Sequence, residues 1–327
     1  MKLLLSISRI AAAVTLALGM LWLILARPGY APKDHAEKYL HAIDTAALRK
    51  HTAVLSNDMA PRSYRDVDNL NKAANYIAES LSSTSDRVTE QAFEVNGVVY
   101  KNIIAEYGPQ GKEIIVIGAH YDTLGDTPGA DDNASGVAGL LEIGRLLGEV
   151  RLKTKVVLVA FTLEEPPFFR SENMGSAVFA KSLAGSDTEV RLMIALEMIG
   201  YYSEEHDSQD YPMLLLRLFY PSTGNFIAVV DQLMSVQAQQ MKASMAQVME
   251  LPVYSINAPT LIPGVDFSDH SNFWNHGYPA VMITDTAFYR NHAYHTDGDR
   301  AERLNYEKMA QVVYGVFDYV VKLSNDR

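Results

Sequence analysis

The chemistry open to this chain depends on histidine and carboxylate side chains, because its 327 residues include 9 histidines and 39 acidic residues but no cysteine. The absence of cysteine excludes a thiol nucleophile, a cysteine zinc site, an iron–sulfur cluster and a disulfide. A metal would therefore have to be held by His, Asp and Glu. The net charge of −11 argues against a nucleic-acid-binding protein, which needs a basic surface.

The candidate residues stand in short polar stretches that follow apolar ones. His120 and Asp122 are two positions apart, so an extended chain would direct both side chains to the same side. Asp131, Asp132 and Asn133 stand together in a loop of small residues. The remaining candidates are the adjacent Glu164 and Glu165, then Glu197, and finally His295.

Each stretch alone has an ordinary structural explanation. A histidine at a strand end is usually a structural residue, adjacent glutamates usually form a solvated turn, and acidic residues before a helix can cap it. A carboxylate that ends an apolar strand, such as Glu197, is harder to explain without a partner. Carboxylates gathered at one place repel one another, and divalent cations would remove that repulsion. Two histidines with several carboxylates suit Zn²⁺, whereas an all-oxygen set would suit Mg²⁺ or Ca²⁺.

The elements that would position these residues follow an α/β pattern. Short β-branched runs alternate with helix-periodic segments, which predicts a mixed, mostly parallel sheet with helices on both faces. Strands at 113–117, 155–163 and 191–196 each lead into candidate residues, and ligands of open α/β sheets bind beyond such strand ends. Further strands are expected at 91–95, 102–107 and 280–284, and helices at 33–55, 64–81, 135–150, 172–183 and 306–323.

The N-terminal segment is a separate feature. Residues 10–26 carry no charge, Lys2 and Arg9 precede them, and Arg27-Pro28 ends the run. At ~1.5 Å per residue the run spans about 25 Å, slightly less than the ~30 Å hydrocarbon core of a membrane. It exceeds the usual length of a signal-peptide core, so an uncleaved signal anchor is favoured over a cleaved signal peptide or a buried globular helix. The basic residues should stay cytoplasmic, which would place the rest outside the cytoplasm, in the periplasm or at the cell surface, anchored in the inner membrane.

The sequence lacks G-x-S-x-G, H-E-x-x-H, a P-loop and G-x-G-x-x-G, which disfavours several other enzyme classes. The candidate residues stand in the strings GAHYDT at 118–123, GADDNASG at 129–136, EEPPFFRSENMGS at 164–176, LEMIGYY at 196–202, SDHSNFW at 268–274 and HTDGD at 295–299. Together these strings resemble the motifs of a known family, the M28 zinc aminopeptidases. The chain would then divide into a signal anchor or signal peptide (1–27), a helical lead-in (28–60) and one zinc-exopeptidase-like domain (61–327).

The resemblance implies a site for two zinc ions. His120 and Glu197 resemble the ligands of one zinc, although many relatives have Asp at the second of these positions. Glu165 and His295 resemble the ligands of the other zinc, and Asp132 resembles the carboxylate that bridges both. Three ligands per metal would leave each zinc an open position for water or substrate.

The resemblance also assigns supporting roles. Glu164 resembles the general base, and Asp122 resembles the carboxylate that orients the His120 ring. The family further implies a cis peptide bond between Asp132 and Asn133. The expected substrates are peptides, from which N-terminal residues would be released.

Two alternatives remain beside this interpretation. Glutaminyl cyclases share the fold with a single zinc, and some relatives keep it as a non-catalytic ectodomain for protein binding. Lesser candidates have both a functional and a structural explanation. Ser268 could cap a short helix near the site, Tyr294 and His292 could line the substrate cleft, and an apolar pocket could be formed by Phe168, Phe169, Phe267 and Trp274.

Overall fold

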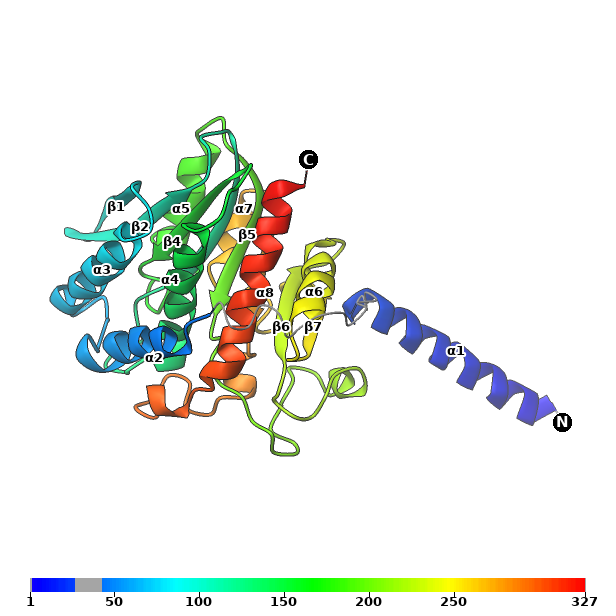
Figure 1. The fold of residues 1–327 in the computed structure, drawn as a ribbon. Coiled ribbons are helices and arrows are strands. Elements are labelled where there is room, and N and C mark those ends of the chain that lie inside the picture. The colour runs from blue at the N-terminus through cyan, green and yellow to red at the C-terminus, as the bar shows by residue number, and fades with distance from the viewer. Residues whose placement is uncertain (1, 27–42, 327) are drawn as a thin grey trace.

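Eight strands form one mixed sheet in the part of the chain that the computed structural model describes, residues 2–26 and 43–326 (Figure 1). The order across the sheet is β1-β2-β4-β3-β5-β8-β6-β7. Strands β4, β3, β5 and β8 are parallel to one another, as are β6 and β7, while the other neighbouring pairs are antiparallel. The strands are β1 (Val88–Val95), β2 (Val98–Tyr107), β3 (Glu113–His120), β4 (Lys155–Phe161), β5 (Glu189–Glu197), β6 (Ile227–Gln232), β7 (Val253–Ala258) and β8 (Ala280–Thr284).

Helices cover both faces of this sheet, so the α/β architecture expected from the sequence is confirmed. Figure 1 shows α4 and α8 in front of the central strands and α5 and α7 behind them. The helices are α1 (Lys2–Ala26), α2 (Thr45–Ala53), α3 (Val67–Ser82), α4 (Gly136–Leu147), α5 (Gly175–Ala184), α6 (Gln237–Val248), α7 (His270–Asn275) and α8 (Tyr306–Asn325).

The central strands are apolar throughout because each of their faces is buried. In β3, Ile115 and Ile117 join the core under α4 and α8, whereas Ile114 and Val116 join the core under α5 and α7. Side chains alternate between the faces of a strand, so a strand covered on both sides needs a continuous apolar run. The same pattern in β4 and β5 explains why these strands were recognisable in the sequence.

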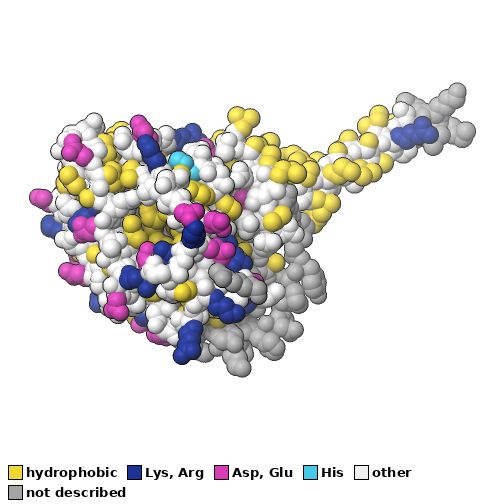
Figure 2. Space-filling view, turned by 90° about the horizontal axis from the view of Figure 1, so that it is seen from above, with side chains coloured by type: hydrophobic (Ala, Val, Ile, Leu, Met, Phe, Trp, Pro, Cys, Tyr) yellow, Lys and Arg dark blue, Asp and Glu magenta, His cyan; other side chains and the backbone are white. Residues whose placement is uncertain are grey.

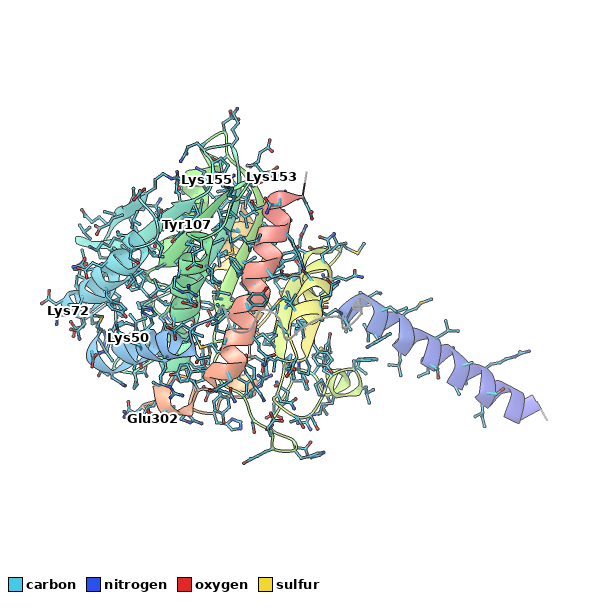
Figure 3. All side chains as sticks on the ribbon, viewed as in Figure 1. Lys50, Lys72, Tyr107, Lys153, Lys155 and Glu302 are labelled. Carbon is cyan, nitrogen blue, oxygen red and sulfur yellow. The ribbon has the colours of Figure 1, made fainter. Side chains whose placement is uncertain are left out.

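The carboxyl ends of the parallel strands meet at one edge of the sheet. In Figure 3, Lys155 at the start of β4 lies at the top, while Glu302 lies at the opposite end of the sheet. Strands β3, β4, β5 and β8 all end toward that lower edge. Residues that follow these strands are therefore brought together although they are far apart in the sequence.

Helix α1 extends away from the sheet, and its C-terminal end packs against the described part of the globular chain (Figure 1). Its residues Ser6–Ala26 are long and apolar enough to cross a membrane, with a mean hydropathy of 2.0. The space-filling view shows this helix as an arm covered with hydrophobic side chains (Figure 2). The N-terminal hydrophobic helix expected from the sequence is therefore present.

Two stretches differ from the sequence-based expectations. Residues 33–42 of the helix expected at 33–55 lie outside the described residues, and within the described part α2 ends at Ala53 and a wider helical turn continues to Asp58. The expectations contained no element between residues 203 and 262, where the structure has β6, α6, β7 and the short 3₁₀ helix Leu214–Leu218. These elements add β6 and β7 to the sheet beyond β8.

Candidate metal centre

His120 is the last residue of β3 and is fully buried at the carboxyl edge of the sheet. Its Nε2 atom lies 3.3 Å from Asp132 Oδ1 and 3.4 Å from Glu197 Oε2. The same nitrogen has no hydrogen-bond partner, although it is shielded from water. A buried imidazole nitrogen that faces two carboxylate oxygens is an arrangement that a bound cation would complete.

A second group lies beside the first and shares one residue with it. His295 Nε2 lies 3.0 Å from Asp132 Oδ2 and 3.2 Å from Glu165 Oε1. Asp132 therefore directs one carboxylate oxygen toward each histidine. All five residues that the sequence suggested as ligands come together in two groups, within each of which the candidate ligand atoms lie within 4.8 Å of one another. The groups are His120, Asp132 and Glu197, and Asp132, Glu165 and His295.

The loop that carries the shared carboxylate is fastened to the end of β5. Asn133 donates its side-chain N–H to the Leu196 carbonyl over 2.8 Å, and its Oδ1 accepts the Met198 N–H over 3.1 Å. Ser135 Oγ accepts the Ile199 N–H over 3.0 Å. These bonds fix the loop relative to the strand that ends in the carboxylate of the first group.

The other side of this loop is held by a residue that the sequence analysis did not single out. Asp299 accepts the main-chain N–H groups of Asp131 and Asp132 over 2.9 and 3.0 Å. The peptide bond between Asp132 and Asn133 is cis, as the family resemblance implies. Gly129 opens the loop with φ of +59°, and a Cβ atom there would lie 2.3 Å from the Asp132 carbonyl oxygen, so this position requires glycine.

Asp122 chiefly positions the glutamate pair. Its two carboxylate oxygens accept the main-chain N–H groups of Glu164 and Glu165, each over 3.1 Å. The His120 Nδ1 atom is 3.2 Å from the main-chain oxygen of Asp122 and 3.6 Å from its carboxylate. The backbone carbonyl of Asp122 is therefore the closer partner of the ring, and its carboxylate is the second.

Burial and repulsion raise the pKa values of the glutamates at this edge. Burial, followed by the nearby Asp132 carboxylate, raises the pKa of Glu165 to about 8. Burial raises the pKa of Glu164 well above its usual range, and the charges of Glu197, Glu165 and Asp269 add to this. Such carboxyl groups hold protons near neutral pH unless positive charge is brought close to them.

The same carboxylates raise the pKa values of the two histidines. Burial alone would lower the pKa of His120, but the nearby carboxylates of Glu197, Asp122 and Asp132 raise it well above its usual value. Burial also opposes the charged form of His295, yet Asp132 and Glu165 raise its pKa to about 10. Without a metal, protons on the two imidazoles supply the positive charge that the buried carboxylates require.

The residues present fit a zinc site by their chemistry. Each group offers one imidazole nitrogen and two carboxylate oxygens, a combination that suits Zn²⁺ better than Mg²⁺ or Ca²⁺. The unpartnered Nε2 atom of His120 faces the first group, which is the orientation that a metal ligand needs. Glu164 belongs to neither group.

Ser268 contacts the candidate centre instead of capping the nearby helix. Its hydroxyl donates a 2.7 Å hydrogen bond to Glu197 Oε2. The helix-capping role expected for this serine is wrong, because α7 begins at His270 and Asp269 takes the position before it. The SDHSNFW string contained the signal, but only the fold shows which carboxylate the serine meets.

An apolar cleft adjoins the centre and contains about 880 Å³ of empty space, part of it open to solvent. Glu197 belongs to its lining, and so does Tyr294, whose ring stacks on His295 with ring centres 3.6 Å apart. Of the aromatic residues considered in the sequence, Phe267 lines the cleft, whereas Phe168 belongs to the hydrophobic core and Trp274 packs against it. Other lining residues are Phe226, Val230, Met282, Phe288 and Tyr289, and His292 is exposed elsewhere.

Solved structures define the class of fold. LapB from Legionella pneumophila superposes with a TM-score of 0.71 at 22% identity, over 93% of this chain and 80% of that one. BSAP, a zinc aminopeptidase from Bacillus subtilis, superposes with a TM-score of 0.68 at 14% identity, over 86% of this chain and 95% of that one. A glutaminyl cyclase from Bacteroides thetaiotaomicron gives 0.62 at 18% identity, over 91% of this chain and 100% of that one. The fold is thus shared by zinc aminopeptidases and glutaminyl cyclases.

The sequence comparisons narrow this to one family. The profile of peptidase family M28 matches residues 102–320, so the chain belongs to that family. The Escherichia coli K12 protein YfbL, which is uncharacterized, is 54% identical over 82% of this chain and 85% of its own length. A probable leucine aminopeptidase of Arthroderma otae is 27% identical over 65% of this chain and 55% of its own length.

Removing the Asp299 carboxylate should weaken metal binding without touching a candidate ligand. An Asp299→Ala variant leaves two buried N–H groups of the Asp132 loop without their acceptor, so we expect zinc affinity to fall by about 10–100-fold. Competition with a chelator measures the affinity, and the exposed Asp297→Ala is the matched control. Unchanged affinity in a folded Asp299→Ala variant would contradict this role.

Proposed function

We propose that this protein is a zinc-dependent aminopeptidase that removes N-terminal residues from peptides. The observation that carries the proposal is the position of the Asp132 carboxylate between two histidines. Its Oδ1 atom lies 3.3 Å from His120 Nε2, and its Oδ2 atom lies 3.0 Å from His295 Nε2. A carboxylate shared in this way is suited to join two metal ions into one centre. Family membership and the aminopeptidase relatives support the same activity.

In the proposed site, His120, Asp132 and Glu197 would hold one zinc ion, and Asp132, Glu165 and His295 would hold the other. Bound zinc would supply Lewis-acid polarisation of the scissile carbonyl and acidify a water molecule. Asp122 would fix the position of Glu164 and Glu165 by accepting hydrogen bonds from their main-chain N–H groups. Ser268 would keep the Glu197 carboxylate in one orientation through its hydroxyl.

Glu164 is the residue we assign to proton transfer. It is buried beside Glu165 yet lies outside both ligand groups, so its carboxylate stays available to water and substrate. As a carboxylate it would accept a proton from the attacking water and pass it to the amine that leaves. A positioned acid–base residue of this kind contributes about 10²–10⁴-fold to the rate.

The surroundings favour a free peptide N-terminus with an apolar first side chain. A substrate ammonium group is attracted by the carboxylates that gather at this edge, whereas an internal peptide nitrogen carries no charge. The cleft beside Glu197 is lined mainly by aromatic and aliphatic residues, which suits an apolar side chain. The proposed preference is therefore for peptides that begin with a large apolar residue.

The alternatives are a single-zinc glutaminyl cyclase and a non-catalytic ectodomain. The fold does not separate the cyclase from the aminopeptidase, because a glutaminyl cyclase and a leucine aminopeptidase precursor, both from Bacteroides thetaiotaomicron, each superpose with a TM-score of 0.62. A site with two complete ligand groups, joined by Asp132, favours the two-metal hydrolase over a one-metal enzyme. It equally disfavours a binding module, which has no use for a set of buried, mutually repelling carboxylates.

We further propose that α1 is an uncleaved anchor in the inner membrane and that the peptidase domain, residues 61–327 after the 28–60 lead-in, lies on the extracytoplasmic side. The apolar stretch Ser6–Ala26 of α1 is long enough to span a membrane. Lys2 and Arg9 precede that stretch and would remain in the cytoplasm.

Metal analysis together with peptide hydrolysis tests the function directly. The purified full chain should carry about two zinc ions and release nitroaniline from aminoacyl-nitroanilides in a chelator-sensitive manner. Apolar residues such as leucine should be the preferred N-terminal group. A chain without bound zinc and without chelator-sensitive cleavage would reject the proposal, and cyclisation of N-terminal glutamine without hydrolysis would favour the cyclase.

A Glu164→Gln variant tests the proposed base. The amide keeps the size of the side chain but cannot take up a proton, so kcat should fall by about 10²–10⁴-fold while the zinc content stays unchanged. Glu172→Gln, at an exposed glutamate in the turn between β4 and α5, is the matched control and should keep its activity. A Glu164→Gln enzyme with near-normal kcat would show that another group moves the proton.

Zinc loading should release protons at neutral pH. His295, with a pKa of about 10, and Glu165, with a pKa of about 8, hold protons in the metal-free chain, and zinc must displace them. Zinc affinity should therefore rise as the pH rises toward these values. Calorimetric titrations in two buffers of different ionisation enthalpy count the protons, and His295→Ala should release fewer. Heats that do not depend on the buffer would contradict the assigned proton positions.

A further inference from the structure

The C-terminal end of α1 is held by two side chains of the globular part. The main-chain oxygen of Ala26 accepts hydrogen bonds from Lys242 Nζ over 3.0 Å and from Ser255 Oγ over 2.8 Å. The last carbonyl groups of a helix have no partners within it, and a lysine at that end also complements the helix dipole. Lys242 is buried, which lowers its pKa to about 8. The end of α1 is thus tied to α6 and β7.

The final turns of α1 also lie side by side with a segment of the globular part. One hydrophobic cluster contains Leu25 and Ala26 together with Leu216 and Tyr220, and Leu21, Trp22, Phe219 and Tyr254 pack against it. Leu21 and Ala26 are five steps apart on α1, which at ~1.5 Å per residue corresponds to about 7 Å along the helix axis. The segment that includes the 3₁₀ helix Leu214–Leu218 therefore flanks the last apolar turns of α1.

This flanking segment also exposes large apolar side chains. Leu216 is buried toward α1, whereas Leu214 is 84% exposed and Leu218 is 67% exposed on the same short helix. Met213, which precedes them, is also exposed. Leucines this exposed are unfavourable in water but are typical of segments that insert shallowly into a membrane interface.

Aromatic residues pack around the end of α1. Trp22 of α1 packs against this cluster, and tryptophan is enriched where a membrane meets water, because one end of its side chain is apolar and the other is polar. Tyr211 and Tyr220, whose ring centres are 6.0 Å apart, belong to the protein side of this contact, because their hydroxyls donate to the main-chain oxygens of Pro221 and Ser255.

We propose that Met213, Leu214 and Leu218 insert into the outer lipid interface beside α1, so that the peptidase domain rests on the bilayer. The proposal depends on α1 being the membrane anchor proposed above. The occupant of this apolar surface is then lipid, because its segment packs against the end of a helix whose exposed hydrophobic side chains need the same covering. Because the C-terminal end of α1 is bonded to the globular part, Leu214 and Leu218 would lie at the same membrane depth as the last turns of α1.

The apolar cleft beside Glu197 is lined in part by residues of this lipid-facing segment. Leu216 and Tyr220 contact the α1 cluster and also line the cleft, as does Tyr254. Leu214 and Leu218 are not part of the cleft lining. The cleft therefore lies next to the membrane surface, and lipid contact is separable from the proposed chemistry by substitution at the two exposed leucines.

The absence of cysteine from the chain makes the test direct, because one introduced cysteine is a unique labelling position. The full chain with Leu214→Cys, carrying an environment-sensitive fluorophore, is reconstituted in vesicles of phosphatidylcholine and phosphatidylglycerol. We expect blue-shifted emission, quenching by nitroxide-labelled lipid, and a several-fold lower quenching constant with aqueous iodide than for the control. The control is Val99→Cys on β2, which is 56% exposed and lies at the opposite side of the sheet from β7.

The outcomes separate the two proposals. A full chain that does not float with the vesicles would overturn the anchor and, with it, the lipid contact, while leaving zinc binding and hydrolysis to be judged by their own assays. A chain that floats but whose Leu214→Cys probe is quenched by iodide as strongly as the control would overturn the lipid contact alone. A probe shielded from both iodide and the lipid quencher would also overturn it, since a second protein surface would then cover the segment. Leu218→Cys should repeat the Leu214→Cys result.

Discussion

The structure at the carboxyl edge of the sheet depends on one buried carboxylate, that of Asp132, which two histidines face from opposite sides. An ionised carboxylate in such a place needs positive charge within a few ångströms, or it takes up a proton. The nearby imidazoles of His120 and His295 hold the pKa of Asp132 below its usual value despite its burial. Positive charge can be supplied there by protons on the two imidazoles or by a cation in each ligand group.

The precision of this edge comes from short polar side chains that bond the backbone of other loops. Asn133 bonds the end of β5, Asp122 bonds the glutamate pair after β4, and Asp299 bonds the loop before α4. Each of these bonds joins segments far apart in the sequence. Long side chains would lose more conformational entropy when fixed, so short carboxylates and amides are efficient at holding loops in register. The ligand residues are consequently positioned by a network rather than by any one element.

The sequence predicted the part of this arrangement that depends on local pattern. Strands β3, β4 and β5 were recognisable because both of their faces are buried, which leaves continuous apolar runs that end in polar residues. The elements β6, α6 and β7 were missed. The strand β7 (VYSINA) lacks a continuous apolar run, and α6 (QAQQMKASMAQV) has few large apolar residues to mark a buried face. The resemblance supplied the roles of the candidate ligands. The bonds of Asp299 and Ser268 could not be foreseen, because they join residues brought together only by the folded sheet.

The missed region is also the one that joins the N-terminal helix to the cleft. β6 and β7 extend the sheet beyond β8, and the segment before them places Leu216 and Tyr220 between the end of α1 and the space beside Glu197. A cleft wall that is packed on a hydrophobic helix is stabilised by that helix, since its removal would return the buried faces of both residues to water. The donors Lys242 and Ser255 would lose the Ala26 carbonyl at the same time. The helix is therefore a supporting part of the cleft, so a fragment that begins after it is not equivalent to the full chain.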